Sequence, residues 1–348
     1  MELKKLIREY LTKKYEENNK KDKYVVKDKS IDNYERNIRI LKEQSSGEQA
    51  YKSLRFLRVN QKNIKKIINE EKSLHTQKAR LIAVVVSLKA INDAENVKVL
   101  KQYEKMLEDV NTKLKERYEE QKATDKEKEN WISYKKILMI KDNMLRNTIR
   151  DVDFFDNPND TSIRDDNFKV FQWVVMLSLE LELPCRNNVA EMKVINSRDE
   201  IEDKKNYILV EKDGDKTTYT TIIGKYKNNK TMKKIHNKVL SDKLSSLLDI
   251  WFIFNKSGWL FVKVKNHNQP INSNDVSKYF LKMFDSFGGG KRVSTTMLRK
   301  IISTHELKGK PTLEEEKKEA DDIENRFQHT IATHKRYRKV DMENIEED

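Results

Sequence analysis

Turn-forming residues are rare in this chain, and their scarcity limits the folds that are open to it. The 348 residues include only eight glycines and four prolines. All-β sandwiches and barrels need many tight turns, for which glycine and proline supply the backbone conformations. We therefore expect a mostly helical protein without proline-rich low-complexity sequence. The length suffices for two separate cores, although the hydrophobic fraction of 36% is low.

The first 120 residues have the periodicity of amphipathic helices. Apolar residues recur every three or four positions along 99–114, which places them in one stripe. Another helix can be capped by Ser73 or Thr76 and contains the run Val84–Val86. Valine has weak helix propensity, so burial must decide there, and a strand is the alternative. Because such polar helices need neighbours for stability, we predict a helical bundle over 1–120.

A polar segment separates this bundle from the rest of the chain. Residues 119–129 include no large apolar side chain, so we place the domain boundary there, with a linker over 121–135. A second domain over 136–340 follows. The acidic stretch 341–348 then forms a tail that we expect to be disordered.

The second domain mixes helix and strand. Residues 168–183 have the most apolar helical pattern of the chain, which Pro184 ends. Strand-forming residues at 206–210 and 217–223 flank Lys-Asp-Gly-Asp, a sequence suited to a hairpin turn. A third short strand is expected at 231–236. The predicted fold class is mostly α with a small antiparallel β element, an N-terminal helical bundle plus an α+β domain.

The chain is strongly basic, with 71 lysines and arginines against 57 acidic residues and a formal charge of +14. Such a surplus favours a polyanionic partner, either nucleic acid or an acidic membrane surface. The longest apolar stretch, 81–88, is too short to span a bilayer. No helix pairs a strong basic face with a broad aromatic one. We therefore expect a nucleic-acid partner and no membrane.

Two further features predict an intracellular protein. The N-terminal residues lack the apolar core of a signal peptide. The single cysteine, Cys185, excludes a disulfide framework and fits a reducing compartment.

Motifs of several enzyme classes are absent. Six scattered histidines and one cysteine give no zinc-ligand spacing. Gly288–Gly290 is not followed by the Lys-Ser/Thr of a phosphate-binding loop, and no Gly-x-Ser-x-Gly elbow occurs. Catalysis would therefore depend on arginine, lysine, histidine and tyrosine, and we predict neither a metal nor another cofactor.

Four stretches carry those residue types. Residues 184–187 read Pro-Cys-Arg-Asn after the apolar helix, and 222–231 read Ile-Ile-Gly-Lys-Tyr-Lys-Asn-Asn-Lys-Thr after the hairpin. Residues 294–300 read Ser-Thr-Thr-Met-Leu-Arg-Lys, and 328–339 read Gln-His-Thr-Ile-Ala-Thr-His-Lys-Arg-Tyr-Arg-Lys. This succession resembles the tyrosine recombinases of the phage-integrase type, and among them the divergent members of large DNA viruses and mobile elements.

The family pattern is an arginine, a hairpin lysine, His-x-x-Arg, a Gly-His box and a tyrosine nucleophile. By this resemblance, Arg186 matches the first arginine and Arg299 matches the arginine of His-x-x-Arg. His329 matches the histidine of the Gly-His box, and Tyr337, eight residues later, matches the nucleophile. The second domain is thus expected to be a tyrosine-recombinase-like catalytic domain.

The remaining positions of the pattern are matched less directly. Lys227 is the best match for the hairpin lysine, and Lys225 is a close competitor. Thr296 stands where the family has the first histidine, and Gln328 where it has glycine. A threonine hydroxyl can still hydrogen-bond a phosphate oxygen, so Thr296 is kept among the catalytic candidates.

The resemblance implies DNA strand transfer through a 3′-phosphotyrosyl intermediate. Two guanidiniums would clamp the charge of the phosphoryl transition state. Lys227 would be the general acid for the leaving 5′-oxygen, and His329 would assist the tyrosine. The phosphotyrosyl ester keeps the energy of the broken bond, so neither ATP nor metal is needed. Integration or another site-specific recombination by a homotetramer on double-stranded DNA is implied, in the cytoplasm or nucleus of a host cell.

The N-terminal half is similar to the family's core-binding domain, which binds DNA. The resemblance covers residues 30–340, strongly only over 180–340. The lysines predicted to contact DNA are Lys62, Lys65, Lys66, Lys225, Lys230 and Lys300. Each could instead belong to a solvated basic face, just as Tyr337 could be an exposed tyrosine and Arg186 a cation at a helix C-terminus.

Two other functions fit the same residues. A type IB topoisomerase-like enzyme has the same catalytic pattern but relaxes supercoiled DNA as a monomer. A DNA-binding protein whose catalysis has lapsed is the other alternative, and Thr296 is its main support. Covalent trapping on DNA distinguishes the lapsed protein, and relaxation of plasmids without a specific site distinguishes the topoisomerase.

Overall fold

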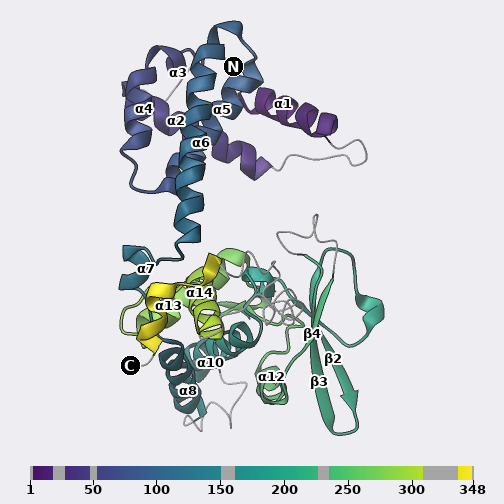
Figure 1. The fold of residues 1–348 in the computed structure, drawn as a ribbon. Coiled ribbons are helices and arrows are strands. Elements are labelled where there is room, and N and C mark those ends of the chain that lie inside the picture. Colours follow the sequence, from purple (N-terminus) through teal and green to yellow (C-terminus); the bar gives the residue numbers. More distant parts are fainter. Residues whose placement is uncertain are drawn as a thin grey trace, which may run out of the picture. The chain divides into compact units, whose positions relative to one another are not determined.

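The computed structural model describes residues 3–18, 28–47, 53–149, 161–225, 235–308 and 336–346. The chain divides into two compact units, Met1–Glu120 and Gln121–Asp348 (Figure 1). None of the described helices combines the length and the hydropathy needed to cross a membrane.

The described part of the first unit is helical throughout. Its helices are α1 (Leu3–Asn18), α2 (Asp28–Ser46), α3 (Phe56–Val59), α4 (Gln61–Asn69), α5 (Leu74–Ile91) and α6 (Val97–Glu119), with a 3₁₀ turn at Ala94–Asn96. α5 packs against α1, α2 and α6, and its Val84 and Val85 are buried. Burial therefore makes the valine run helical, and the Ser73 hydroxyl caps the helix by accepting from the Thr76 amide. The predicted helical bundle is confirmed.

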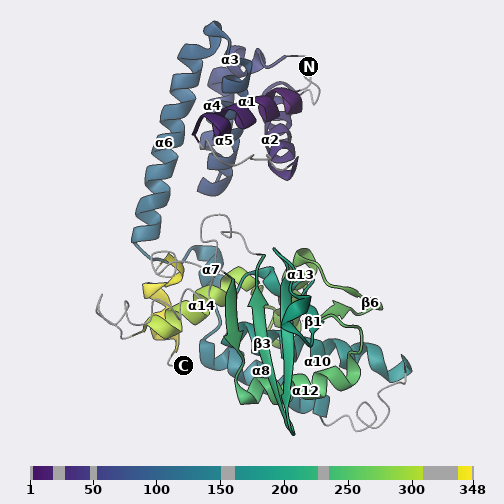
Figure 2. The same ribbon diagram turned by 90° about the vertical axis from the view of Figure 1, so that its right-hand side faces the viewer.

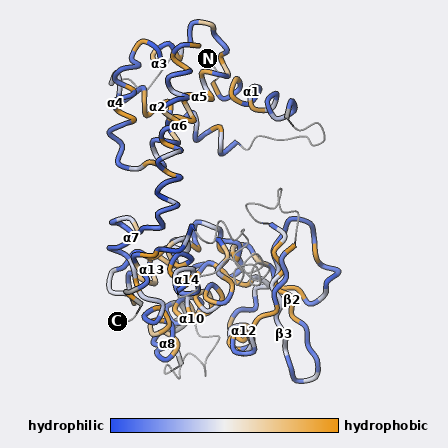
Figure 3. The backbone as a smooth tube through the Cα atoms, in the orientation of Figure 1, coloured by the Kyte–Doolittle hydropathy of each residue, from blue (hydrophilic) through white to orange (hydrophobic). Residues whose placement is uncertain are grey.

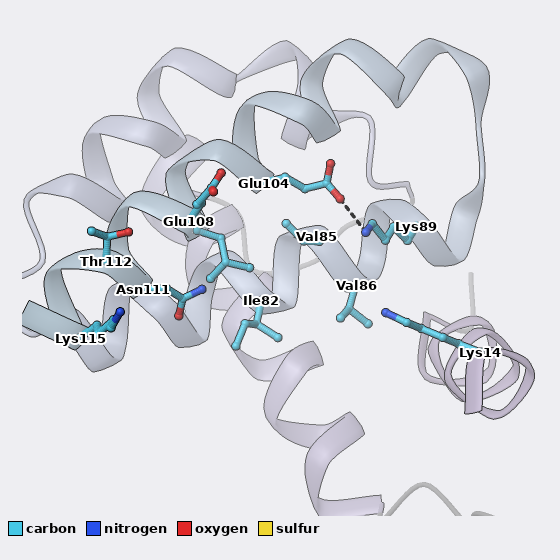
Figure 4. A pocket seen from close by; sticks show the side chains of 11 residues that line it. Lys14, Ile82, Val85, Val86, Lys89, Glu104, Glu108, Asn111, Thr112 and Lys115 are labelled. Atoms are coloured by element: carbon cyan, nitrogen blue, oxygen red, sulfur yellow. Dashed lines mark ion pairs between the residues drawn. The ribbon is translucent and has the colours of Figure 1, made fainter. Parts of the chain in front are cut away.

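An open groove of 520 Å³ lies between α1, α5 and α6 (Figure 4). Ile82, Val85 and Val86 contribute apolar side chains to it, and Lys89 pairs with Glu104 at 2.6 Å on its rim. None of the candidate catalytic or DNA-binding residues that the structure describes lines this groove.

In its described residues, the second unit combines helices with two small sheets. Its helices are α7 (Asp125–Glu129), α8 (Tyr134–Ile149), α10 (Thr161–Glu182), α12 (Asp242–Phe254), α13 (Ser273–Phe287) and α14 (Thr295–Leu307), and its 3₁₀ helices are η2 (Asn187–Val189), η3 (Arg198–Glu200) and η4 (Val340–Glu346). Its strands are β1 (Lys193–Ile195), β2 (Asn206–Asp213), β3 (Lys216–Ile223), β4 (His236–Val239), β5 (Val262–Lys263) and β6 (Asn266–Pro270).

The larger sheet has the order β1-β2-β3-β4. The predicted hairpin forms β2 and β3, and Gly214 has a φ of 58° in the two-residue turn between them. The third strand is described at His236–Val239, where His236 pairs with Ile223 of β3; residues 231–234 of the predicted strand lie outside the described residues. β1 adds a parallel pair with β2 that the sequence pattern did not predict. α12 covers β3, and Tyr219 donates a hydrogen bond to Asp249 across this contact (Figure 2).

The core of the second unit is organised around α10, which packs against α8, α12 and α13. Apolar residues predominate along this helix, whereas the C-terminal part of α6 in the first unit is hydrophilic (Figure 3). Trp251 of α12 is fully buried, and its ring lies 4.9 Å from that of Phe168, centroid to centroid. The Trp251 indole N–H donates to the carbonyl of Leu260 at 2.9 Å. The fold class is the predicted one, mostly α with small sheets.

Two segments that we expected to lie outside the core contribute to it. Residues 121–135, predicted as a linker, place Ala123, Trp131 and Ile132 in the core of the second unit. The tail predicted over 341–348 begins within η4 and buries Met342, which is 1% exposed. Both segments have low overall hydropathy, but each contains apolar residues that pack in the core of the second unit.

Candidate active site

Arg299 is the buried centre of the candidate site. α14 begins after the Ser294 cap. Its buried face, with Leu298, Ile301 and Ile302, packs into the core. Arg299 is only 2% exposed, and its Nε donates to the carbonyl of Pro184 at 3.0 Å. Burial lowers the pKa of this guanidinium, but arginine titrates so high that it stays charged at neutral pH.

Tyr337 lies directly against that guanidinium. Arg299 Nη1 donates to the Tyr337 hydroxyl oxygen at 3.3 Å, and the Arg299 Cζ atom lies 4.7 Å from the centroid of the phenol ring. The tyrosine is half-buried. A phenol oxygen in contact with a guanidinium lies where positive charge and an attacking oxygen can meet at one phosphate.

Arg186 places a second positive charge within electrostatic reach of Arg299. It follows the end of α10 in extended backbone, before η2, and is half-buried. The pKa of Arg299 is lowered first by burial; the phenol of Tyr337 opposes that shift, and the positive charge of Arg186 reinforces it. Guanidiniums suit a phosphate and a tyrosine hydroxyl is a possible nucleophile, so these three residues make up the candidate site.

Asn187 holds the Arg186 segment against two helices. Its Oδ1 accepts from the Thr295 hydroxyl of α14 at 2.8 Å, and its Nδ2 donates to the Ser273 carbonyl and the Ser277 hydroxyl at the start of α13. Sequence reasoning missed Asn187, although it stands next to Arg186 in Pro-Cys-Arg-Asn. The buried threonine is Thr295, whereas the predicted Thr296 is exposed.

Asn206 of β2 joins the end of the hairpin to this segment. Its Nδ2 donates to the carbonyls of Asn188 and Lys225 at 2.9 and 3.1 Å, and its Oδ1 accepts from the Lys225 amide at 2.7 Å. A Cβ atom at Gly224 would lie 2.8 Å from the Lys205 carbonyl, so only glycine fits this approach. An asparagine inside a strand gives no sequence signal for such a role.

Lys225 lies where the hairpin ends, two residues beyond β3. Its Nζ is 3.6 Å from the carboxylate of Glu191, and both side chains are largely exposed. The other hairpin candidates, Lys227 and Lys230, lie outside the described residues, as does His329.

The remaining predicted lysines differ in their surroundings. Lys62 is exposed on α4, and the largely exposed Lys66 is 3.8 Å from Glu70. Lys65 donates to the side chain of Gln102 and is half-buried. Lys300 pairs with Glu127 in a largely buried contact.

Glu180 and Cys185 form a buried pair close to Arg299. The Cys185 thiol lies 3.8 Å from Glu180 Oε1, and the Oε2 atom of Glu180 has no hydrogen-bond partner. Burial raises the pKa of both groups, and the charge of Arg299 opposes that shift. Among the described residues, no group of three or more histidine, cysteine or acidic side chains could hold a metal ion.

We expect the single thiol to be unreactive in the folded chain. Cys185 is 0% exposed, and burial raises the pKa of its thiol, so little of the reactive thiolate is present. Ellman's reagent at pH 8 should titrate less than about a tenth of an equivalent within minutes. In guanidinium chloride it should titrate the one cysteine of the chain completely. A full equivalent in native buffer would contradict this burial.

No protein-family model matches the chain, and no curated protein gives a significant match. Among solved structures, it is similar to the crystal structure of the XerH site-specific recombinase bound to difH substrate in a pre-cleavage complex. The TM-score is 0.52 at 14% sequence identity, over 99% of this chain and 84% of that one. The chain therefore has a tyrosine-recombinase-like fold, in which the candidate residues Arg186, Arg299 and Tyr337 gather in the α+β unit.

Proposed function

We propose that the protein is a site-specific DNA recombinase or integrase that cleaves and rejoins DNA strands through Tyr337. The observation that carries this proposal is the contact between the Tyr337 hydroxyl and the buried guanidinium of Arg299, at 3.3 Å, within a recombinase-like fold. The contact with a desolvated arginine suits a phenol oxygen that acts as a nucleophile.

The proposed step exchanges one phosphodiester for another. The Tyr337 hydroxyl gives up its proton and its oxygen forms a bond to the phosphorus, while the bond to the 5′-oxygen breaks and the leaving oxygen takes up a proton. A 3′-phosphotyrosyl ester and a free 5′-hydroxyl result, and attack by a 5′-hydroxyl reverses the step. Arg299 and Arg186 would offset the charge on the non-bridging oxygens, and this interaction is strong because Arg299 is shielded from water.

The remaining candidates complete this proposal, and two of them, Lys227 and His329, lie outside the described residues. Lys227, or Lys225 in its place, would protonate the leaving oxygen, and His329 would assist the tyrosine. Asn206 supports the hairpin assignment, because it holds Lys225 beside the Arg186 segment. Thr296 is exposed and could reach a phosphate that arrives from solution.

The proposed partner is duplex DNA, on which four copies would assemble. The neighbouring structure is that of a recombinase bound to its substrate. Lys62, Lys66 and Lys225 are exposed and could contact phosphates, whereas Lys300 is held by Glu127 and is the weaker candidate. The reaction would take place wherever the host keeps its DNA, in the nucleus or the cytoplasm.

Trapping on nicked DNA tests the proposal. We expect the full-length protein to form a covalent adduct with a pool of nicked suicide duplexes of randomised sequence, because loss of a short 5′-hydroxyl fragment prevents rejoining. The adduct should survive denaturation, its peptide should map to Tyr337, and the trapped duplexes should share a sequence. Absence of any adduct, together with salt-dependent DNA binding, would indicate a lapsed DNA-binding protein.

The same preparation distinguishes recombination from topoisomerase activity. A site-specific recombinase should leave a supercoiled plasmid without the selected sequence unrelaxed. Relaxation of every plasmid, with adducts that share no sequence, would instead favour the type IB topoisomerase-like alternative.

A further inference from the structure

The chain that follows Tyr337 returns to the helix that carries Arg299. We call residues 338–343 the C-terminal strap. The amide of Lys339, two residues after the tyrosine, donates to the hydroxyl of Thr304 at 2.9 Å. Thr304 is 0% exposed and Lys339 is 5% exposed. Because water cannot replace this acceptor in a buried position, the hydrogen bond determines where the backbone of the strap lies.

Thr304 and Arg299 belong to the same rigid element. They are five residues apart on α14, which is about 7.5 Å along the helix axis. Arg299 contacts the hydroxyl oxygen of Tyr337, while Thr304 holds the backbone just beyond that residue. One helix therefore positions both the nucleophilic side chain and the main chain that carries it.

The strap has a second anchor on the first residues of the second unit. Asp341 accepts from the Ala123 amide at 2.8 Å and pairs with Lys128 at 3.1 Å. The Val340 amide donates to the Gln121 carbonyl at 3.1 Å. Burial favours the neutral acid, but the Ala123 amide and Lys128 hold the pKa of Asp341 below its usual value. The strap is thus attached to α14 through Lys339 and to the start of the second unit through Asp341.

We propose that Thr304 is the positioning residue for the nucleophile: its buried hydroxyl holds the C-terminal strap and so keeps the Tyr337 oxygen beside Arg299 of the same chain. This inference rests on the proposed function, because it assigns the role through Tyr337. A misplacement of about 1 Å in a reacting group can lower a rate by about a hundredfold, so the loss of this single acceptor should be visible in the chemical step.

Two substitutions at Thr304 separate positioning from packing. Thr304→Val keeps the shape and removes the acceptor, so we expect adduct formation on the selected suicide duplex to slow by about 10- to 100-fold. Thr304→Ser keeps the hydroxyl and loses only a methyl group, so its rate should stay within about threefold of wild type. The dissociation constant for an intact duplex should change less than about twofold in both variants.

A matched control addresses the general effect of losing a buried hydroxyl. Thr148 of α8 is 2% exposed, and its hydroxyl donates to the Met144 carbonyl within the same helix. Thr148→Val makes the same change away from the strap and should leave the rate of adduct formation unchanged. If Thr304→Val does not fold, as judged by circular dichroism, Asp341→Ala releases the second anchor and should slow adduct formation by about tenfold or more with unchanged affinity.

Two results would overturn the role of Thr304. One is wild-type adduct formation by Thr304→Val, or by Asp341→Ala where the first variant does not fold. The other is a serine variant as slow as the valine variant, which would indicate that the methyl group matters through packing. Failure of the proposed function is separately visible, because the wild-type protein would then form no adduct in the same assay.

Discussion

Replacement of Tyr337 by phenylalanine is expected to abolish covalent capture of DNA while DNA binding persists. The phenylalanine ring can still pack on the Arg299 guanidinium, whose Cζ atom lies 4.7 Å from the ring centroid of the tyrosine, so the local fold should survive. Only the attacking oxygen is lost, so the ester at position 337 cannot form. The rate of adduct formation should fall below detection, by at least about 10³-fold.

The matched control for this change is Tyr219→Phe. Tyr219 also loses a hydroxyl that makes a hydrogen bond, to Asp249 at 2.8 Å, but it lies on β3 beneath α12. The control should form the adduct at the wild-type rate. Both rates would be measured in single turnovers on the selected suicide duplex, with denaturing gels as the readout. Equal adducts from Tyr337→Phe and wild type would rule out this nucleophile.

Replacement of Arg299 by alanine is expected to lower the rate of adduct formation by about 10²–10³-fold. The guanidinium supplies preorganised positive charge in a site that is shielded from water, and it donates to the attacking oxygen. Arg299→Lys keeps a charge but cannot donate from Nε to Pro184 and bind a phosphate in the same geometry, so most of the loss should remain. Arg198→Ala removes an exposed arginine paired with Glu211 and should have no effect.

Stability has to be separated from chemistry in this experiment, because Arg299→Ala also leaves the buried Glu180 without its nearby positive charge. We therefore include Arg299→Met combined with Glu180→Leu, which replaces both ionisable groups and fills the space. This double variant should unfold at higher urea concentration than Arg299→Ala and should still form adduct as slowly. All four tryptophans lie after residue 130, so their fluorescence follows the second unit alone. A double variant with wild-type cleavage would contradict the role of Arg299.

The helical character of the chain could be predicted because it depends on local patterns. The stripe along 99–114 became α6, and the strand-forming residues around Gly214 became the β2–β3 hairpin. Each of these two patterns involves residues that are only a few positions apart along the chain. Val84 and Val85 show the limit of such signals, since their propensity left helix and strand open until burial against α1, α2 and α6 decided.

The candidate site could be predicted only as a set of residue types in order. Arg299 and Tyr337 were selected by resemblance, and their contact joins positions 38 residues apart. Asn187 and Asn206 were missed, because a side-chain amide serves as a connector only when the groups it joins are already close in space. Lys300 was expected on DNA and is paired with Glu127, a partner 173 residues away.

The sequence by itself determined a basic, mostly helical chain, and its resemblance to a family selected Arg186, Arg299 and Tyr337 as site candidates. Only the tertiary structure decided that the polar segment 121–135 and the acidic segment 341–346 pack into the second unit. It also decided that α14 contacts both the Tyr337 hydroxyl, through Arg299, and the Lys339 amide, through Thr304. The physical reason is that periodicity reports which face of an element is apolar. Hydrogen bonds and ion pairs between distant segments depend instead on which buried groups meet once the core has formed.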